Sequence, residues 1–306
     1  MRLWLLLWGC QEELSPPPKT LRQPPPIFVD MNNQNWNYPS SSIMSDLPQN
    51  TDPILQKANI YYHEEAYLKA AELLIPYLEQ HPQDVIGHSI LGAAFFRLKD
   101  MTQAEKAARN ALKYEESTII YSNLGSILLG KGDIKGAIEA YEKARLLDPK
   151  HFLPIRNLVT LYYKSRNLPL AEELLYELIK IDPSDSYGYV SLGQVLVEQE
   201  KWSEAEALYR FRLLDLQNTP KEERYLAGGL MLDLPLALGR VLLHQKKYKK
   251  SEEAFLYTLQ LSTKVQSTWA PRSDYQRYAY EGLLSIYKVE GKTEKYRAIQ
   301  KQLEGL

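Results

Sequence analysis

One segment of the chain matches most of a phosphate-binding loop. The heptapeptide from Gly125 to Lys131 has the two glycines and the lysine at the spacing that wraps the phosphates of a nucleotide. The next residue, Gly132, stands where such a loop needs a Ser or Thr hydroxyl for the metal ion, and the segment lies in a helical pattern rather than after a strand. We therefore assign Gly125 to helix packing and Gly132 to an inter-helix turn.

The histidines do not have the spacing of a metal site. No two of them are three or four residues apart, the separation at which one helix presents two ligands: His63, His81, His88, His151 and His244. His88 falls in a sequence column that is usually aromatic, so we expect it to pack. No serine elbow and no glycine-rich dinucleotide fingerprint occurs. These observations predict a non-enzymatic protein that needs no cofactor and no metal.

Cys10 is the only cysteine, which excludes an intramolecular disulfide. The stretch Leu7-Trp8-Gly9-Cys10 resembles the lipobox of bacterial lipoproteins, in which the cysteine is lipidated and anchors the protein. The resemblance implies that residues 1–10 are a short signal ending at the lipid-attachment site Cys10. Gln11, where an aspartate would imply retention in the inner membrane, favours the outer membrane.

The apolar run before Cys10 has six residues, fewer than the roughly 7 to 15 of a signal core. Trp8 also stands where a small or β-branched residue is usual. A start codon further upstream would lengthen the run. The alternative is an apolar N-terminus with an incidental cysteine.

The first fifty residues differ in composition from the rest. They hold 8 of the 18 prolines but only 7 of the 75 charged residues. Two triprolines, at 16–18 and 24–26, favour extended polyproline II. We predict that residues 11–50 are a disordered Pro-rich tether that reaches on the order of 100 Å.

The charge balance argues against a nucleic-acid partner. The formal net charge is −1, and the estimated pI is 6.6. One basic run, residues 246–250, is either a solvated turn or a surface for an acidic partner.

From residue 51 onward the chain repeats itself. Alanines recur at separations of 34, 33, 34 and 34 residues: Ala70, Ala104, Ala137, Ala171 and Ala205. A second column holds Leu91, Leu124, Leu158, Leu192 and Leu238, and a glycine follows four of these leucines directly. Prolines close three of the units, at Pro82, Pro149 and Pro183.

This pattern resembles the tetratricopeptide repeat, whose motif runs W-x₂-L-G-x₂-Y, then A-x₃-F, then P. The segment from Tyr121 to Pro149 is the best copy, and the resemblance covers about 250 residues. It implies an all-α fold, an α-solenoid of about seven helix pairs in which each pair covers the next. Because two helices approach closely only where side chains are small, we expect the glycine column to face the alanine column.

We place this superhelix over residues 51–306. Its units lie near 51–84, 85–117, 118–151, 152–185, 186–231, 232–276 and 277–306. Lys57 and Tyr296 depart from the columns in the first and last units, which suits capping units. The spacing lengthens to 46 and then 45 residues after Ala205, so inserts near 216–231 and 263–276 are either helical extensions or loops. Thr219-Pro220 and Ala270-Pro271 mark breaks.

In tetratricopeptide arrays the first helix of each pair lines a concave groove that commonly holds a peptide. Helical projection of this chain turns eleven side chains toward that groove: Asn59, Tyr62, Phe96, Asn123, Ser126, Arg156, Asn157, Thr160, Tyr163, Gln194 and Arg240. Amides can pair with a peptide backbone, and aromatic rings supply apolar contact. Burial between units is the alternative, above all for Phe96. The partner predicted is a protein or peptide.

Two functions follow from these features. The first is a lipid-anchored scaffold of the bacterial cell envelope, held in the outer membrane and facing the periplasm, whose groove binds a partner during complex assembly. The second is a soluble cytoplasmic adaptor or regulator with an incidental Cys10. Membrane fractionation separates them.

Overall fold

The computed structural model describes residues 47–48, 51–184, 186–218, 230–264 and 271–306. These residues form fourteen α-helices, and no strand occurs among them. The contacts divide the helices into two compact units, an N-terminal unit with the helices of residues 53–181 and a C-terminal unit with those of residues 186–304. The fold is the all-α solenoid of seven helix pairs that the repeat columns predict.

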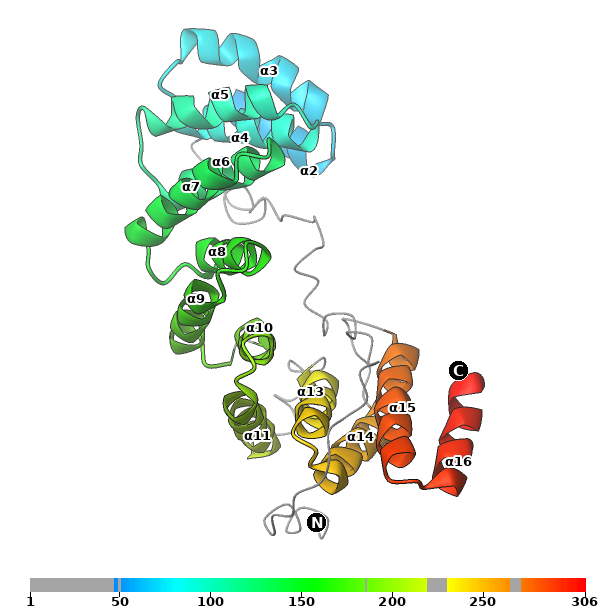
Figure 1. Cartoon of the computed structure of the whole chain (residues 1–306). Coiled ribbons are helices and arrows are strands. Elements are labelled where there is room, and N and C mark those ends of the chain that lie inside the picture. The colour runs from blue at the N-terminus through cyan, green and yellow to red at the C-terminus, as the bar shows by residue number, and fades with distance from the viewer. Residues whose placement is uncertain (1–46, 49–50, 185, 219–229, 265–270) are drawn as a thin grey trace. The chain divides into compact units, whose positions relative to one another are not determined.

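The N-terminal unit contains four helix pairs (Figure 1). They are α2 (Pro53–His63) with α3 (Tyr67–Gln80), α4 (Val85–Arg97) with α5 (Met101–Leu112), α6 (Thr118–Gly130) with α7 (Ile134–Leu147), and α8 (Phe152–Lys164) with α9 (Leu168–Ile181). Each first helix packs on its own partner, and each second helix packs on the first helix of the next pair. First helices also contact one another, α2 with α4 and α4 with α6.

The C-terminal unit contains three pairs that pack in the same order. They are α10 (Ser186–Glu198) with α11 (Trp202–Asn218), α13 (Leu230–His244) with α14 (Tyr248–Ser262), and α15 (Arg272–Val289) with α16 (Thr293–Glu304). The second insert lengthens a helix, because α15 begins directly after Pro271 and has 18 residues. The first insert lies largely outside the described residues. No residue of α16 is buried, in keeping with a capping position.

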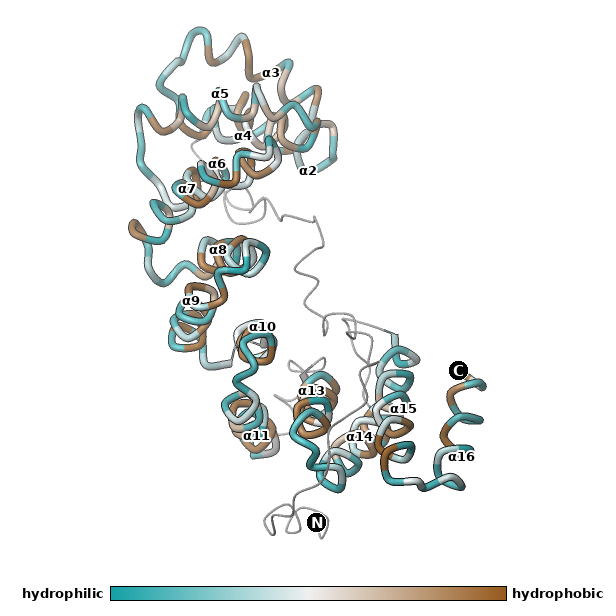
Figure 2. The backbone as a smooth tube through the Cα atoms, viewed as in Figure 1, coloured by the Kyte–Doolittle hydropathy of each residue, from teal (hydrophilic) through white to brown (hydrophobic). Residues whose placement is uncertain are grey.

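Local sequence signals set the helix bounds. Four carboxylates cap helix N-termini among the described residues: Asp84 accepts from the Gly87 backbone N–H at 2.7 Å, and Asp52, Asp100 and Asp133 do the same for α2, α5 and α7. The prolines of the repeat stand two residues beyond the ends of α3, α7 and α9. Hydrophobic stretches recur between hydrophilic ones along each helix, as the brown and teal segments of Figure 2 show.

The two main columns form the core. All five column alanines are fully buried, and the column leucines are at most 8% exposed. The expectation that glycine faces alanine is wrong for most of the array. A Cβ on Gly125 would lie 2.7 Å from the Tyr141 ring, and one on Gly239 would lie 2.7 Å from the Phe255 ring.

The facing residue is therefore the aromatic one helical turn after the column residue, which is Ala137 before Tyr141 and Ser251 before Phe255, since residues four apart share a face of the helix. Gly193 follows the same rule with Tyr209. Gly92 alone of the four faces alanines, with a Cβ 3.5 Å from both the Ala104 carbonyl oxygen and the Ala107 Cβ.

Candidate functional site

The predicted partner-binding residues of the N-terminal unit lie on its first helices. We call this set the first-helix face, and it comprises Asn59 and Tyr62 on α2, Phe96 on α4, Asn123 and Ser126 on α6, and Arg156, Asn157, Thr160 and Tyr163 on α8. Tyr62, Asn123 and Ser126 are buried, and the other six are half-buried. The structure thus distributes the set over four consecutive pairs.

Helix α8 carries the largest part of this face. Its four members, Arg156, Asn157, Thr160 and Tyr163, are all half-buried. The Arg156 guanidinium lies 4.8 Å from the centroid of the Phe152 ring, an arrangement in which the cation interacts with the ring. The Thr160 hydroxyl donates to the Arg156 carbonyl oxygen at 3.0 Å, so its donor is used within the helix. Arg156, Asn157 and Tyr163 therefore offer the polar and aromatic contacts here.

Helix α6 contributes two buried side chains with different bonding. Ser126 is 1% exposed, and its hydroxyl lies 3.1 Å from the Ser122 carbonyl oxygen and 2.9 Å from the Tyr141 hydroxyl. Burial raises the pKa of Tyr141, which keeps this phenol neutral. The hydrogen-bonding capacity of Ser126 is thus used within its own helix pair, and we remove it from the face.

Asn123 is 2% exposed, and its Oδ1 has no hydrogen-bond partner among the described residues. A buried amide oxygen without a donor costs free energy, and a donor from a bound chain would recover it. Asn123 is therefore a buried member of the face whose bonding the described structure leaves incomplete.

Aromatic residues gather where α2 and α4 end. The Tyr62 ring packs edge-on against the Tyr67 ring at 5.3 Å, and the Arg97 guanidinium lies 5.4 Å from the Tyr67 ring. The Arg97 Nε also donates to the Tyr67 hydroxyl at 3.1 Å, and this hydrogen bond raises the pKa of Arg97. Sequence projection missed Tyr67 and Arg97, because the contact joins the ends of helices from different pairs.

The C-terminal unit holds the other two predicted residues. Gln194 on α10 is 9% exposed, and Arg240 on α13 is half-buried with its guanidinium 4.9 Å from the Tyr278 ring. Burial lowers the pKa of Arg240 to about 10. The Arg240 Nη1 has no hydrogen-bond partner in the part of the chain that the structure describes. Both side chains belong to first helices, as predicted.

The structure also locates the segment that resembles a phosphate-binding loop and the basic run. Gly125 lies within α6, and Gly132 has a φ of +81° in the α6–α7 turn, a conformation suited to glycine. The basic run spans the α13–α14 turn and the start of α14, and Lys247 pairs with Glu206 at 2.7 Å. The run is therefore a turn of the array.

Cys10 and residues 11–46 lie outside the described residues. In the described ranges, no three His, Cys, Asp or Glu side chains form a group able to hold a metal. None of the helices in those ranges combines the length and apolarity needed to span a membrane.

Stacked antiparallel helix pairs, in which a glycine of the first helix packs against an aromatic ring of the second, define a helical repeat array. Models of the tetratricopeptide repeat match residues 55–117, 102–152 and 128–189. Residues 55–189 therefore carry tetratricopeptide repeats, a repeat that typically mediates protein–protein interactions.

Two known proteins resemble this chain at low sequence identity. A Bos taurus protein named BBSome complex member BBS4 is 30% identical over 106 residues, which are 35% of this chain and 20% of that protein. Anaphase-promoting complex subunit 6 of Arabidopsis thaliana is 24% identical over 302 residues, covering 86% of this chain and 52% of that protein. The chain spans about half or less of the length of these relatives.

The fold is shared with a solved structure of bacterial origin. The C-terminal part of a TPR repeat-containing protein from Cytophaga hutchinsonii superposes with a TM-score of 0.67 at 18% identity, covering 82% of this chain and 95% of that one. This likeness establishes the tetratricopeptide solenoid as the fold.

Proposed function

We propose that the protein is a non-enzymatic scaffold that binds an extended segment of a partner protein on its first-helix face during the assembly of a complex. The observation that carries the proposal is Asn123, whose buried Oδ1 lacks a donor among the described residues at the centre of this face. A backbone N–H of a bound segment is the donor that an extended chain supplies.

The composition of the face supports the same conclusion. Aromatic and amide side chains flank Asn123, with Phe96 on one neighbouring first helix and Asn157 on the other. Such residues contact many different side chains while they fix the backbone of the ligand. Two relatives are named as members of multi-protein complexes, which also supports a role in assembly.

The first test of this function is the variant Asn123→Leu. Leucine has a similar volume and removes the unpaired oxygen, so we expect thermal stability to be unchanged or raised. We expect partner affinity to fall about five- to tenfold, because the bound segment loses its acceptor. A variant that binds the partner as tightly as the wild type would remove Asn123 from the site.

A second variant tests the accessible end of the face. Arg156→Ala with Tyr163→Ala should weaken co-purification of the partner and leave the melting temperature nearly unchanged. The matched control is Lys143→Ala with Leu146→Ala on α7, where Leu146 is 68% exposed. Equal loss of partner in both double variants, or unfolding of the first, would contradict the assignment.

We further propose that Cys10 is lipidated and anchors the scaffold in a bacterial outer membrane, facing the periplasm. Leu7-Trp8-Gly9-Cys10 and the Pro-rich stretch that follows support this proposal. Several acyl chains, each contributing about 0.8 kcal/mol per buried CH₂, would make such an attachment stable.

Intact-mass analysis in a bacterial host, with and without Cys10→Ala, tests the anchor. A mature chain that begins at a lipid-modified Cys10, together with release of the variant from membranes, is the expected result. An unmodified chain in the soluble fraction would favour the second candidate, a cytoplasmic adaptor, and would leave the first-helix face unaffected.

A further inference from the structure

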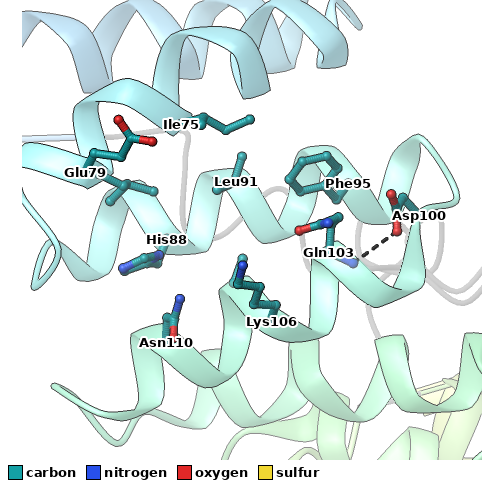
Figure 3. Close-up of a pocket in the computed structure, with 11 residues that line it drawn as sticks. Ile75, Glu79, His88, Leu91, Phe95, Asp100, Gln103, Lys106 and Asn110 are labelled. Atoms are coloured by element: carbon teal, nitrogen blue, oxygen red, sulfur yellow. Dashed lines mark hydrogen bonds between the residues drawn. The ribbon is translucent and has the colours of Figure 1, made fainter.

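A cleft opens within the N-terminal unit between α3, α4 and α5 (Figure 3). Its volume is about 500 Å³, enough for one or two large side chains. Leu78, Leu91 and Phe95 line it with apolar groups, which we call its apolar floor. The side chains of His88 and Asn110 lie at one end of the cleft in Figure 3. The cleft is separate from the first-helix face, because His88, Leu91 and Phe95 share one side of α4 and Phe96 projects from another.

The composition of α5 explains why space is left here. All four buried residues of this helix are alanines: Ala104, Ala107, Ala108 and Ala111. The buried face of the helix therefore has no large side chain with which to fill the space beside Ala107, and its exposed Gln103 and Lys106 side chains line the cleft. Ile75 of α3, on the opposite wall, is 45% exposed although it is apolar.

His88 gives the cleft a specific polar group. Its side chain is 6% exposed, and Nε2 lies 2.8 Å from the Pro82 carbonyl oxygen. A carbonyl oxygen only accepts, so Nε2 carries the hydrogen, and in the neutral ring Nδ1 is then an acceptor. Nδ1 is buried and has no hydrogen-bond partner among the residues that the structure places.

Asn110 supplies a matching donor. Its side chain and that of His88 point toward one another across the end of the cleft in Figure 3. The Asn110 Oδ1 accepts from Lys113 Nζ at 2.8 Å, which leaves the amide N–H groups to donate. An acceptor and a donor thus converge beside an apolar floor.

We propose that this cleft binds a tyrosine side chain of a partner protein. The ring would lie on Leu91 and Phe95, and the hydroxyl would donate to His88 Nδ1 while it accepts from the Asn110 amide. An aliphatic side chain would leave Nδ1 unpaired, and a carboxylate has no proton to donate to it. A phenol combines a planar apolar body with a hydroxyl that both donates and accepts.

Methyl and imidazole NMR of the full chain tests this inference with p-cresol, which reproduces the tyrosine side chain, and with toluene, which lacks the hydroxyl. We expect p-cresol to shift the Ile75, Leu91 and His88 signals with a Kd on the order of 1 mM, as its size allows. Toluene should bind at least about fivefold more weakly, because it makes neither of the two hydrogen bonds.

Two variants complete the experiment. His88→Phe keeps an aromatic ring and removes the acceptor but not the Asn110 donor, so p-cresol should lose most of its advantage over toluene. His151→Phe is the matched control, because its Nδ1 is also buried without a partner among the described residues but does not line the cleft.

Three results would overturn the proposal: equal affinities for the two probes in the wild type, undiminished p-cresol binding by His88→Phe, or no shifts at the cleft at saturating probe. If His88→Phe does not fold, the two-probe comparison on the wild type decides the question.

Discussion

Replacing two glycines of one repeat column by alanine should change stability in opposite directions. Both Gly92 and Gly125 lie inside first helices, where alanine is favoured over glycine by about 0.5 to 1 kcal/mol. At Gly92 the new Cβ would meet its nearest neighbours at 3.5 Å, which is ordinary contact. Gly92→Ala should therefore stabilise the protein by about that amount.

At Gly125 the same Cβ would lie 2.7 Å from the Tyr141 ring. Tyr141 is fully buried and its hydroxyl is bonded to Ser126, so the ring cannot move aside without loss. Overpacking of this kind costs typically 1 to 3 kcal/mol. After the gain in helix propensity, Gly125→Ala should destabilise by about 1 to 2 kcal/mol, which places the two variants about 2 kcal/mol apart.

Unfolding in guanidinium chloride measures this difference. If the variants share the same dependence of unfolding free energy on denaturant, the difference appears as a shift in the midpoint concentration. Tyr141→Leu provides the control, because in that background the added Cβ finds room and Gly125→Ala should lose most of its cost. The reasoning is refuted if the two alanine variants have the same stability, or if the cost of Gly125→Ala persists in the double variant that also carries Tyr141→Leu.

Three further outcomes follow from the structure. Burial raises the pKa of Asp233 to about 7, so the folded protein retains a proton that the unfolded chain releases near its ordinary pKa, and stability falls as the pH rises between these values. Asp233→Asn should abolish this fall and stabilise at pH 8 by up to about 4 kcal/mol, as calorimetry at pH 5 and pH 8 will show. Lys99 has a φ of +64°, so Lys99→Gly should raise the free energy of unfolding by up to about 1 kcal/mol, whereas Gly132→Lys should lower it. Hydrogen bonds from Lys131 and Arg109 lower the pKa of Glu105, and the stability that these bonds contribute is lost as the pH falls through the lowered pKa. Glu105→Gln should therefore lower the free energy of unfolding in urea by less than about 1 kcal/mol, and by less still at high salt.

The helix pairs could be predicted from the sequence because their packing repeats with a fixed period. The column spacing places unit starts at Val85, Thr118, Phe152 and Ser186, and helices α4, α6, α8 and α10 begin at those residues. Each unit buries the same columns against the next, so the period of the sequence is the period of the structure.

The partner of each glycine could not be predicted in the same way. Ala137 and Tyr141 lie one turn apart on the same face of α7, and the columns do not show which of them meets Gly125. Only the approach of the two helices places the Tyr141 ring against the glycine.

The polar residues of the candidate site show the same limit. Helical projection assigns Ser126 and Asn123 to one face of α6. The Ser126 hydroxyl is hydrogen-bonded to Tyr141, however, whereas the Asn123 Oδ1 lacks a donor among the described residues. The aromatic column correctly predicts that His88 packs. Its unpartnered Nδ1 depends on Pro82, six residues away, and on the short side chains of α5.

Site-directed photocrosslinking tests the central claim, that the partner binds the first-helix face. A benzophenone side chain is placed at Asn157 or Tyr163 on α8, and in separate proteins at Lys143 or Leu146 on α7, in cells of the native host. Adducts with the same protein from both α8 positions, and none from the α7 positions, are the predicted result. Adducts of equal yield from both helices, or from α7 alone, would contradict the account.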